Sequence, residues 1–190
     1  MRLILTRHGQ TEDNIKGILQ GQNHGKLSQL GIEQAKKLAL RLKTEKIDAI
    51  FSSDLKRAAD TAEEIHKFHK NIPLILEKDL REGNLGDFVG KESSKVNWDK
   101  MPNNAETLED MQKRVVSLLD RIYKKYKDKT VLFVAHQGIN KALILHILSK
   151  PLEEIDKLGK FQNTSVSIFE IREDKKHIVH LMNCSKHLQE

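Results

Sequence analysis

The sequence predicts a three-layer α/β/α sandwich around a mostly parallel central sheet, and three observations support this fold class. Short, wholly apolar runs alternate with longer amphipathic segments, which is typical of strands that are buried on both faces and joined by helices. The chain has 190 residues, of which 38% are hydrophobic and 32% charged. That length suits one well-packed domain, which we expect to span residues 1–190. We find no internal repeat, low-complexity tract or linker.

The first half of the chain alternates strand and helix signals. Residues 3–6 predict a short buried strand, and Ser28 predicts the cap of the helix that follows. A second strand is expected at 47–51, and Ser52 or Ser53 is expected to cap a second helix. The apolar faces of these helices, at helical spacing, are Ile32, Ala35, Leu38, Ala39 and Leu42 in the first and Leu55, Ala58, Ala59, Ala62 and Ile65 in the second.

The second half repeats the alternation around one irregular stretch. A strand is expected at 74–76, and residues 83–105, which contain three glycines and little periodicity, predict an irregular segment that covers the fold. We call residues 83–105 the covering segment. Thr107 and Asp110 form a capping-box pattern before a helix. Its expected buried face is Leu108, Met111, Val115, Leu118, Leu119 and Ile122. A strand at 131–135, a helix at 139–148 and a hairpin of strands at 165–171 and 177–182 complete the prediction.

Two histidines follow fully apolar strands at equivalent places. His8 and His136 each come directly after such a strand, and each is followed by a glycine within two residues. Open α/β sheets bind ligands at the carboxyl ends of their strands, so two central strands would bring both imidazoles into one crevice. We expect the glycines to let the backbone approach a ligand closely. A single histidine of this kind is more often structural, but the pair, with Arg7 adjacent, favours a site.

Arg57 and Glu82 are two further candidates. Arg57 falls in the first turn of a predicted helix, where a cation opposes the helix dipole and a bound anion would remove the conflict. Glu82 follows a strand-like run directly. The alternatives are an exposed arginine and an ordinary surface carboxylate. The guanidinium group of an arginine can donate two hydrogen bonds to phosphate oxygens, and a neutral imidazole can attack phosphorus. A carboxyl group can protonate a leaving alcohol and later activate water.

The stretch TRHGQTEDN at residues 6–14 resembles the RHGxTxxN signature of the histidine phosphatase superfamily, also called the phosphoglycerate mutase-like family. SSDLKRAADTA, LREGNLGDF and VAHQG follow in the family's order, so the resemblance covers almost the whole chain. It implies a phosphoglycerate mutase-like sandwich and chemistry without a metal or other cofactor. By position it implies that His8 is the phosphorylated nucleophile and Glu82 the proton donor. It further implies that Arg7, Arg57 and His136 bind the phosphoryl group, that Asn14 supports the pocket, and that Gln20, Gly21, Gln137 and Gly138 face the substrate.

Two positions depart from the common family pattern. Gln137 stands where most small members have glycine, and a glutamine there resembles the fructose-2,6-bisphosphatase branch. In the acid phosphatase branch an aspartate at this place donates the proton, so Gln137 supports Glu82 as the donor; Glu106 and Asp87 are the next candidates. Lys141 stands where an arginine is common, and we leave it out of the core site.

The compact stretch between Glu82 and His136 favours a phosphatase over a mutase, because mutases of the family carry a longer enclosing segment there. The sequence is compatible with four substrates, which are a sugar bisphosphate, phosphoglycerate, phosphoserine and α-ribazole phosphate. The covering-segment residues that could contact the substrate are Lys91, Lys95, Trp98 and Lys100. A non-catalytic phospho-ligand binder is disfavoured because the chain keeps both the histidine and the glutamate. A metal-dependent hydrolase could use His66 with His69 or His177 with His180. The first pair, however, lies on a predicted surface helix without nearby paired ligands, and the second pair falls on opposite faces of a strand.

The net charge of +6 fits a small anionic substrate. Nucleic acid is not an expected partner, because the cations are scattered and aromatic residues make up only 5% of the chain. No apolar run is long enough to cross a membrane, and we expect no signal peptide. Cys184 is the only cysteine and cannot form an intramolecular disulfide, so we expect a cytoplasmic protein. We expect a monomer or homodimer that acts on a small phosphorylated metabolite.

Overall fold

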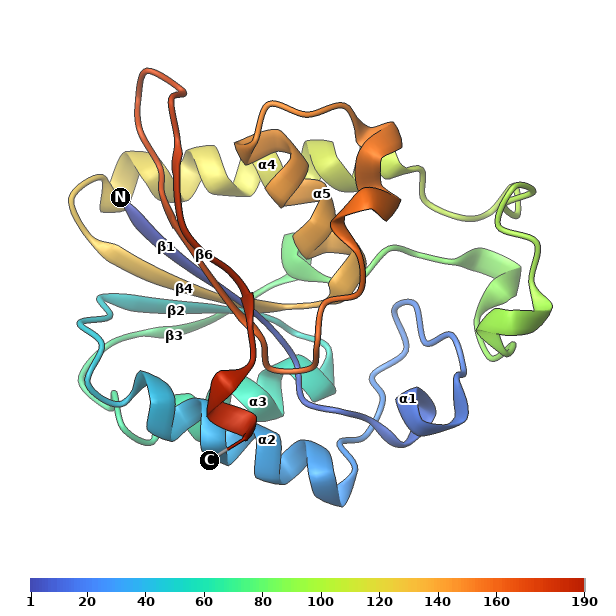
Figure 1. Ribbon diagram of the computed structural model, residues 1–190, viewed down its shortest axis with the longest axis horizontal. Coiled ribbons are helices and arrows are strands. Elements are labelled where there is room, and N and C mark those ends of the chain that lie inside the picture. The colour runs from blue at the N-terminus through green and yellow to red at the C-terminus, as the bar shows by residue number, and fades with distance from the viewer. Residues whose placement is uncertain (190) are drawn as a thin grey trace.

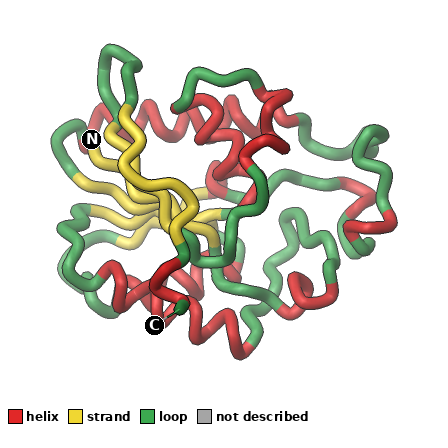
Figure 2. The backbone as a smooth tube through the Cα atoms, in the orientation of Figure 1, coloured by secondary structure: helices red, strands yellow, loops and turns green. Residues whose placement is uncertain are grey.

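The computed structural model describes residues 1–189, and in that range six strands form one sheet in the order β3-β2-β4-β1-β5-β6 (Figure 2). The strands are β1 (Arg2–Arg7), β2 (Ala49–Ser53), β3 (Leu74–Glu77), β4 (Thr130–Ala135), β5 (Val166–Glu170) and β6 (Ile178–Cys184). β1, β2, β3 and β4 run parallel to one another, whereas β5 is antiparallel to both β1 and β6. The predicted mostly parallel sheet and the closing hairpin are therefore confirmed.

Helices cover both faces of the sheet, as the predicted sandwich requires (Figure 1). One face carries α2 (Gln29–Leu42) and α3 (Lys56–His66), and the other carries α4 (Leu108–Tyr126) and α5 (Gln137–Ile147). The short helix α1 (Glu12–Lys16) lies in the loop after β1. The 3₁₀ turns are η1 (Lys78–Leu80), η2 (Gly86–Phe88), η3 (Ser93–Lys95), η4 (Leu152–Leu158) and η5 (Lys186–Leu188).

The central strands β1 and β4 are buried on both faces because their side chains alternate between two apolar cores. Leu3, Leu5 and Phe133 pack with α4 and α5, whereas Ile4 and Leu132 pack with α2 and α3. This double burial explains why both strands read as uninterrupted apolar runs. It also fixes the two strand ends, where the candidate histidines follow, on a rigid support.

Three local predictions need correction. Residues 47–48 precede β2, which instead runs on to Ser53, so neither Ser52 nor Ser53 caps α3. Leu55 holds the cap position of that helix, and an apolar side chain cannot accept a hydrogen bond there. Leu108, expected in the core, is 38% exposed because it lies at the first position of α4. Ser28 does cap α2, accepting the N–H of Gly31 at 3.0 Å.

The covering segment is irregular, as predicted, and lies beside the loop that follows β1 (Figure 1). Leu19 and Lys91 are joined by a backbone hydrogen bond of 2.9 Å, and Gly90 donates to the carbonyl of Leu19 at 2.8 Å. Ser93 extends this pairing by donating to the carbonyl of Gly17 at 2.9 Å.

None of the helices in residues 1–189 combines the length and the apolar character needed to span a bilayer.

Candidate active site

The two histidines predicted to share a crevice lie side by side at the centre of the sheet edge. β1 and β4 are neighbours in register, with Arg7 opposite Ala135, and the N–H of His8 donates to the carbonyl of Ala135 at 3.0 Å. The imidazole centroids of His8 and His136 are 5.1 Å apart. Both residues are buried. The prediction that His8 and His136 meet at the ends of two central strands is therefore confirmed.

The hydrogen bonds of His8 define which of its ring nitrogens carries the proton. Nδ1 lies 2.6 Å from the carbonyl oxygen of Gly9, which can only accept, so Nδ1 carries the proton. Nε2 lies 3.3 Å from Nε of Arg57, which can only donate, so Nε2 holds a lone pair. Burial, with Arg57 and Arg7 close by, holds the pKa of His8 well below its usual value. The imidazole is therefore neutral, with its lone pair on Nε2.

His136 presents the opposite ring nitrogen. Its Nε2 lies 2.9 Å from the hydroxyl of Ser53 at the end of β2. Its Nδ1 is buried and has no hydrogen-bond partner within the described residues. Burial first, and then the charge of Arg57, keeps the pKa of His136 well below its usual value. A buried, unpartnered imidazole nitrogen in this position is suited to an oxyanion ligand.

Arg57 is anchored by the loop at 21–24. Nη2 donates to the carbonyl of Gly21 at 2.9 Å, and Nη1 donates to the carbonyls of Asn23 and His24. Burial lowers the pKa of Arg57 to about 10, with the charge of Arg7 acting in the same direction, but the group stays protonated at neutral pH. The N–H groups at the start of α3 that were expected to be free are not, because His24 accepts those of Lys56 and Arg57. An anion bound by the Arg57 side chain stays a prediction.

Arg7 is held from the opposite side of the site. Its Nη1 donates to the carbonyl of Phe161 at 2.6 Å and approaches Oε1 of Gln137 at 3.4 Å. The same Gln137 oxygen accepts the N–H of Phe161 at 3.2 Å, so this side chain joins the start of α5 to the loop before β5. Nε of Arg7 is buried without a partner in residues 1–189. Arg7 and His136 thus both keep a buried nitrogen that is available to a ligand.

The carboxylate of Glu82 lies at the N-terminus of α5. Oε2 accepts the N–H of Gly138 at 3.0 Å, and Oε1 accepts those of Ile139 and Gly83, both at 3.1 Å. A negative charge is favoured at this end of a helix. Glu82 is close enough to Arg7 and Arg57 for its charge to counteract the lowering of both pKa values by burial. The carboxylate therefore belongs to the same site as the arginines.

The glycines after the two histidines stand where a side chain would collide with neighbouring atoms, and their expected closeness to a ligand stays a prediction. A Cβ on Gly9 would collide with the backbone of Gly31 in α2. A Cβ on Gly138 would lie 2.6 Å from Oε1 of Glu82. Gly138 is thus the position that makes room for the carboxylate.

The predicted residues of the first loop form a support beside this centre. Oδ1 of Asn14 accepts the N–H of Thr11 at 3.1 Å in a capping box that starts α1. Nε2 of Gln20 donates to the hydroxyl of Thr11 at 2.9 Å, and its Oε1 is buried without a partner in the described part of the chain. Gly21 has a φ of 49°, and a Cβ added there would lie 2.9 Å from Cγ2 of Val89 in the covering segment.

Several supporting residues were not predicted. Ser53 binds His136, and Thr61 accepts the N–H of Gly9 at 3.1 Å. Asn163 donates to the carbonyl of His8 at 2.9 Å. These residues carry no motif, and only the tertiary fold brings them to the site.

Lys141, which we left out of the core site, is 9% exposed. Burial lowers its pKa, and Arg7 and Glu82 are close enough for their charges to act on that pKa as well.

The other candidates are placed elsewhere or are already bound. Glu106 pairs with Arg114, and Asp87 accepts from the side chain of Asn104 at 2.9 Å. Trp98 packs edge-to-face on Phe88, their ring centroids being 5.9 Å apart. Lys91 lies over the ring of Phe88, and Lys95 pairs with Glu92.

Within residues 1–189, no group of three or more His, Cys, Asp or Glu side chains is arranged to hold a metal.

These groups together can bind a tetrahedral oxyanion and react with it. Two buried arginines supply positive charge, and Nε of Arg7 and Nδ1 of His136 are buried groups that still need partners. A phosphoryl group offers several acceptor oxygens to such donors. The lone pair of His8 lies among them, and the carboxylate of Glu82 lies within range of their charge.

Comparisons with known proteins agree with this geometry. The family model described as histidine phosphatase superfamily (branch 1) matches residues 3–184. The metal-independent phosphoserine phosphatase of Arabidopsis thaliana is 34% identical over 189 residues, which cover 91% of this chain and 77% of that protein. YhfR of Bacillus stearothermophilus superposes with a TM-score of 0.91 at 28% identity and 98% coverage of both chains. A mutant phosphoserine phosphatase from Entamoeba histolytica, in complex with phosphoserine, gives a TM-score of 0.87 at 28% identity, again with 98% coverage of both.

Proposed function

The chain belongs to the histidine phosphatase superfamily, and we propose that it is a phosphatase that hydrolyses small phosphate monoesters through a phosphohistidine on His8. One observation carries this proposal most directly. The carbonyl of Gly9 fixes the proton on Nδ1 of His8, so the lone pair of Nε2 is directed into a site that contains two buried arginines. A neutral imidazole in a cationic site is suited to attack a phosphate ester.

In the first step, Nε2 of His8 attacks phosphorus, the P–N bond forms and the bond to the ester oxygen breaks. Glu82 supplies a proton to the departing oxygen, so the alcohol leaves neutral. Arg7, Arg57 and Nδ1 of His136 stabilise the charge on the three equatorial oxygens.

In the second step, water attacks the phosphohistidine. Glu82, now a carboxylate, takes a proton from the water as the P–O bond forms and the P–N bond breaks. Inorganic phosphate leaves, and His8 regains its lone pair. The proton that Glu82 gave to the alcohol is restored from water, so the enzyme returns to its starting state.

The two arginines supply the positive charge that a metal ion supplies in other phosphatases, so the proposed reaction takes no metal cofactor. The substrate class is a small phosphorylated metabolite. Phosphoserine is the first member to test, because two of the similar proteins described above are phosphoserine phosphatases.

A substrate panel tests the proposal. The purified protein would be assayed for phosphate release from phosphoserine, 3-phosphoglycerate, a sugar bisphosphate, α-ribazole phosphate and p-nitrophenyl phosphate, with and without EDTA. We expect release that survives chelation and is lost in His8→Ala. Activity that disappears with EDTA and returns with a divalent ion would contradict the proposal, as would a His8→Ala variant with near-normal turnover.

A further inference from the structure

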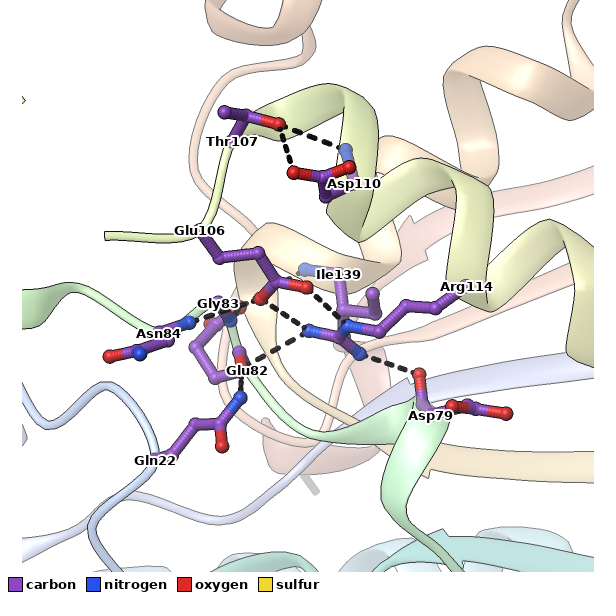
Figure 3. Close-up of polar contacts among 10 residues, drawn as sticks. All are labelled: Gln22, Asp79, Glu82, Gly83, Asn84, Glu106, Thr107, Asp110, Arg114 and Ile139. Carbon is purple, nitrogen blue, oxygen red and sulfur yellow. Dashed lines mark hydrogen bonds and ion pairs between the residues drawn. The ribbon is translucent and has the colours of Figure 1, made fainter. Parts of the chain in front are cut away.

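Arg114 is an α4 residue that reaches the turn carrying Glu82 (Figure 3). Its Nε and Nη2 donate to the two carboxylate oxygens of Glu106 at 2.6 and 3.0 Å. Nη1 donates to the carbonyl of Asp79 at 2.6 Å, and Nη2 also donates to the carbonyl of Glu82 at 3.2 Å. The planar fork of an arginine is required for this set of bonds, because a lysine ammonium cannot reproduce it.

Glu106 extends the same arrangement to the other side of Glu82. Its Oε2 accepts the N–H of Asn84 at 3.1 Å, and its own N–H donates to the carbonyl of Asn84 at 2.7 Å. The two ends of the covering segment are therefore joined at its base, and Arg114 binds the junction. As a result the backbone is held at Asp79, Glu82 and Asn84, before and after the carboxylate-bearing residue (Figure 3).

The location of this backbone determines whether the Glu82 carboxylate meets its partners. Two of its three N–H donors, Gly138 and Ile139, belong to α5 and are fixed by the helix. The third, Gly83, belongs to the turn that Arg114 and Glu106 hold. A shift of the turn would move the carboxyl group relative to α5 and to the imidazole of His8. A misplacement of about 1 Å in a reacting group can cost about 10²-fold in rate.

Stability alone is a weak reason to bury these two charges. The side chains of Arg114 and Glu106 are 18% and 16% exposed. Replacing such an ion pair with uncharged groups of similar size is often neutral for stability. A role in fixing geometry accounts better for a pair whose remaining hydrogen bonds go to the backbone on both sides of one functional residue.

We propose that the Arg114–Glu106 ion pair positions the Glu82 carboxyl group for proton transfer and thereby acts on one chemical step more than on the others. This inference rests on the proposed function, because it takes Glu82 as the proton donor. Arg114 and Glu106 are positioning residues that need not touch the substrate. Their loss should slow the cleavage of esters whose leaving group needs a proton, and spare esters whose leaving group does not.

The test compares two esters in single-turnover and burst experiments. Phosphoserine releases a poor leaving group, whereas p-nitrophenyl phosphate releases an anion that leaves without a proton. In the double variant Arg114→Met, Glu106→Gln no buried charge is left unpaired, and Arg114→Lys keeps the charge but loses the fork. We expect both variants to slow phosphoserine cleavage by about 10²-fold, with the burst of p-nitrophenolate unchanged. Arg121→Met is the matched control, because Arg121 lies on the same helix and pairs with the carboxylate of Asp79 at 2.9 Å.

Equal slowing of both esters, or no slowing of either, would overturn the inference. Circular dichroism and melting would establish that each variant is folded, and Arg114→Lys alone decides the outcome if the double variant is not. The variant Glu82→Gln distinguishes a failure of the proposed function from a failure of this inference. If Glu82→Gln slows both esters equally, Glu82 is not the donor and the proposed acid step fails together with this inference. If it selectively slows phosphoserine cleavage while the Arg114 variants do not, the inference alone fails.

Discussion

The hydroxyl of Ser53 lies 2.9 Å from Nε2 of His136 and connects the end of β2 to the proposed phosphoryl site. The same oxygen accepts the N–H of Leu55 at 3.2 Å, and among the described residues its own proton has no acceptor other than Nε2 of His136, so we assign the hydroxyl as the donor in this pair. Nε2 of His136 is then the acceptor, and the ring proton lies on Nδ1, which is the buried atom without a partner among residues 1–189. Ser53 thus turns a neutral histidine into a hydrogen-bond donor facing the site.

Ser53→Ala should weaken the binding of vanadate or phosphate and lower kcat/KM by about tenfold, the usual worth of one hydrogen bond to a charged group. The physical reason is that Nε2 could then take the proton and leave Nδ1 as an acceptor facing an anion. Ser52→Ala is a suitable control, because Ser52 is equally buried and its hydroxyl donates to the carbonyl of Ser53 at 3.0 Å. Calorimetric titration with vanadate measures the difference. Equal losses in the two variants would contradict the assignment of the ring proton.

Gly138→Ala should impair the proton-transfer step although it adds only a methyl group. The new Cβ would lie 2.6 Å from Oε1 of Glu82, which is closer than real Cβ contacts allow, so the carboxylate must move. We expect phosphoserine cleavage to slow by about 10²-fold, with the p-nitrophenolate burst retained. Gly159→Ala supplies a comparison, although its φ of 64° adds backbone strain, because a Cβ there would meet nothing within 4 Å. A Gly138→Ala protein with unchanged phosphoserine kinetics would contradict the assigned place of Glu82.

The buried histidines should make stability depend on pH. Burial, with Arg57 second, lowers the pKa of both His8 and His136 in the folded protein, whereas an unfolded histidine titrates near 6.5. Above about pH 6.5 both states are neutral and the contribution is complete. As the pH falls below that value, only the unfolded chain takes up protons, so the free energy of unfolding decreases. Each such histidine contributes a slope of about 1.4 kcal/mol per pH unit.

Urea denaturation without phosphate, at several pH values between about 7 and 5, would measure this slope. In His136→Asn the slope should be smaller by about 1.4 kcal/mol per pH unit. His146 and His177, whose pKa values are also lowered, are present in both proteins and cancel in the comparison. Identical slopes for the wild-type protein and the variant would contradict the account of His136 as a buried neutral group.

The mostly parallel character of the sheet and the pairing of the histidines could be predicted because they depend on local sequence. A fully apolar run predicts a strand buried on both faces, and such strands occupy the middle of a parallel sheet. β1 and β4 satisfy this rule, so His8 and His136 were expected to meet, and their rings are 5.1 Å apart. The roles of individual residues were expected only by resemblance to the family.

The supporting residues could not be predicted, because their partners are distant in sequence. Ser53 has a sequence context typical of a helix cap, yet β2 continues through it and brings its hydroxyl to His136. Arg114 lies among charged residues of an amphipathic helix, and nothing in that pattern indicates bonds to the backbone at Asp79 and Glu82. Gly9 was expected to let the backbone approach a ligand closely, and nothing near it in sequence indicated that a Cβ there would collide with Gly31 of α2. Close packing between elements decided all three cases.

The central claim is that phosphate passes through Nε2 of His8, and trapping the phosphoenzyme tests it most directly. The protein would be mixed with ³²P-labelled substrate, quenched in base during turnover, digested and mapped by mass spectrometry, with Glu82→Gln used to slow hydrolysis of the intermediate. We predict a phosphate that is stable in base and labile in acid, attached to His8 and absent from His8→Ala. Turnover without a labelled protein, or a label on any residue other than His8, would contradict the account.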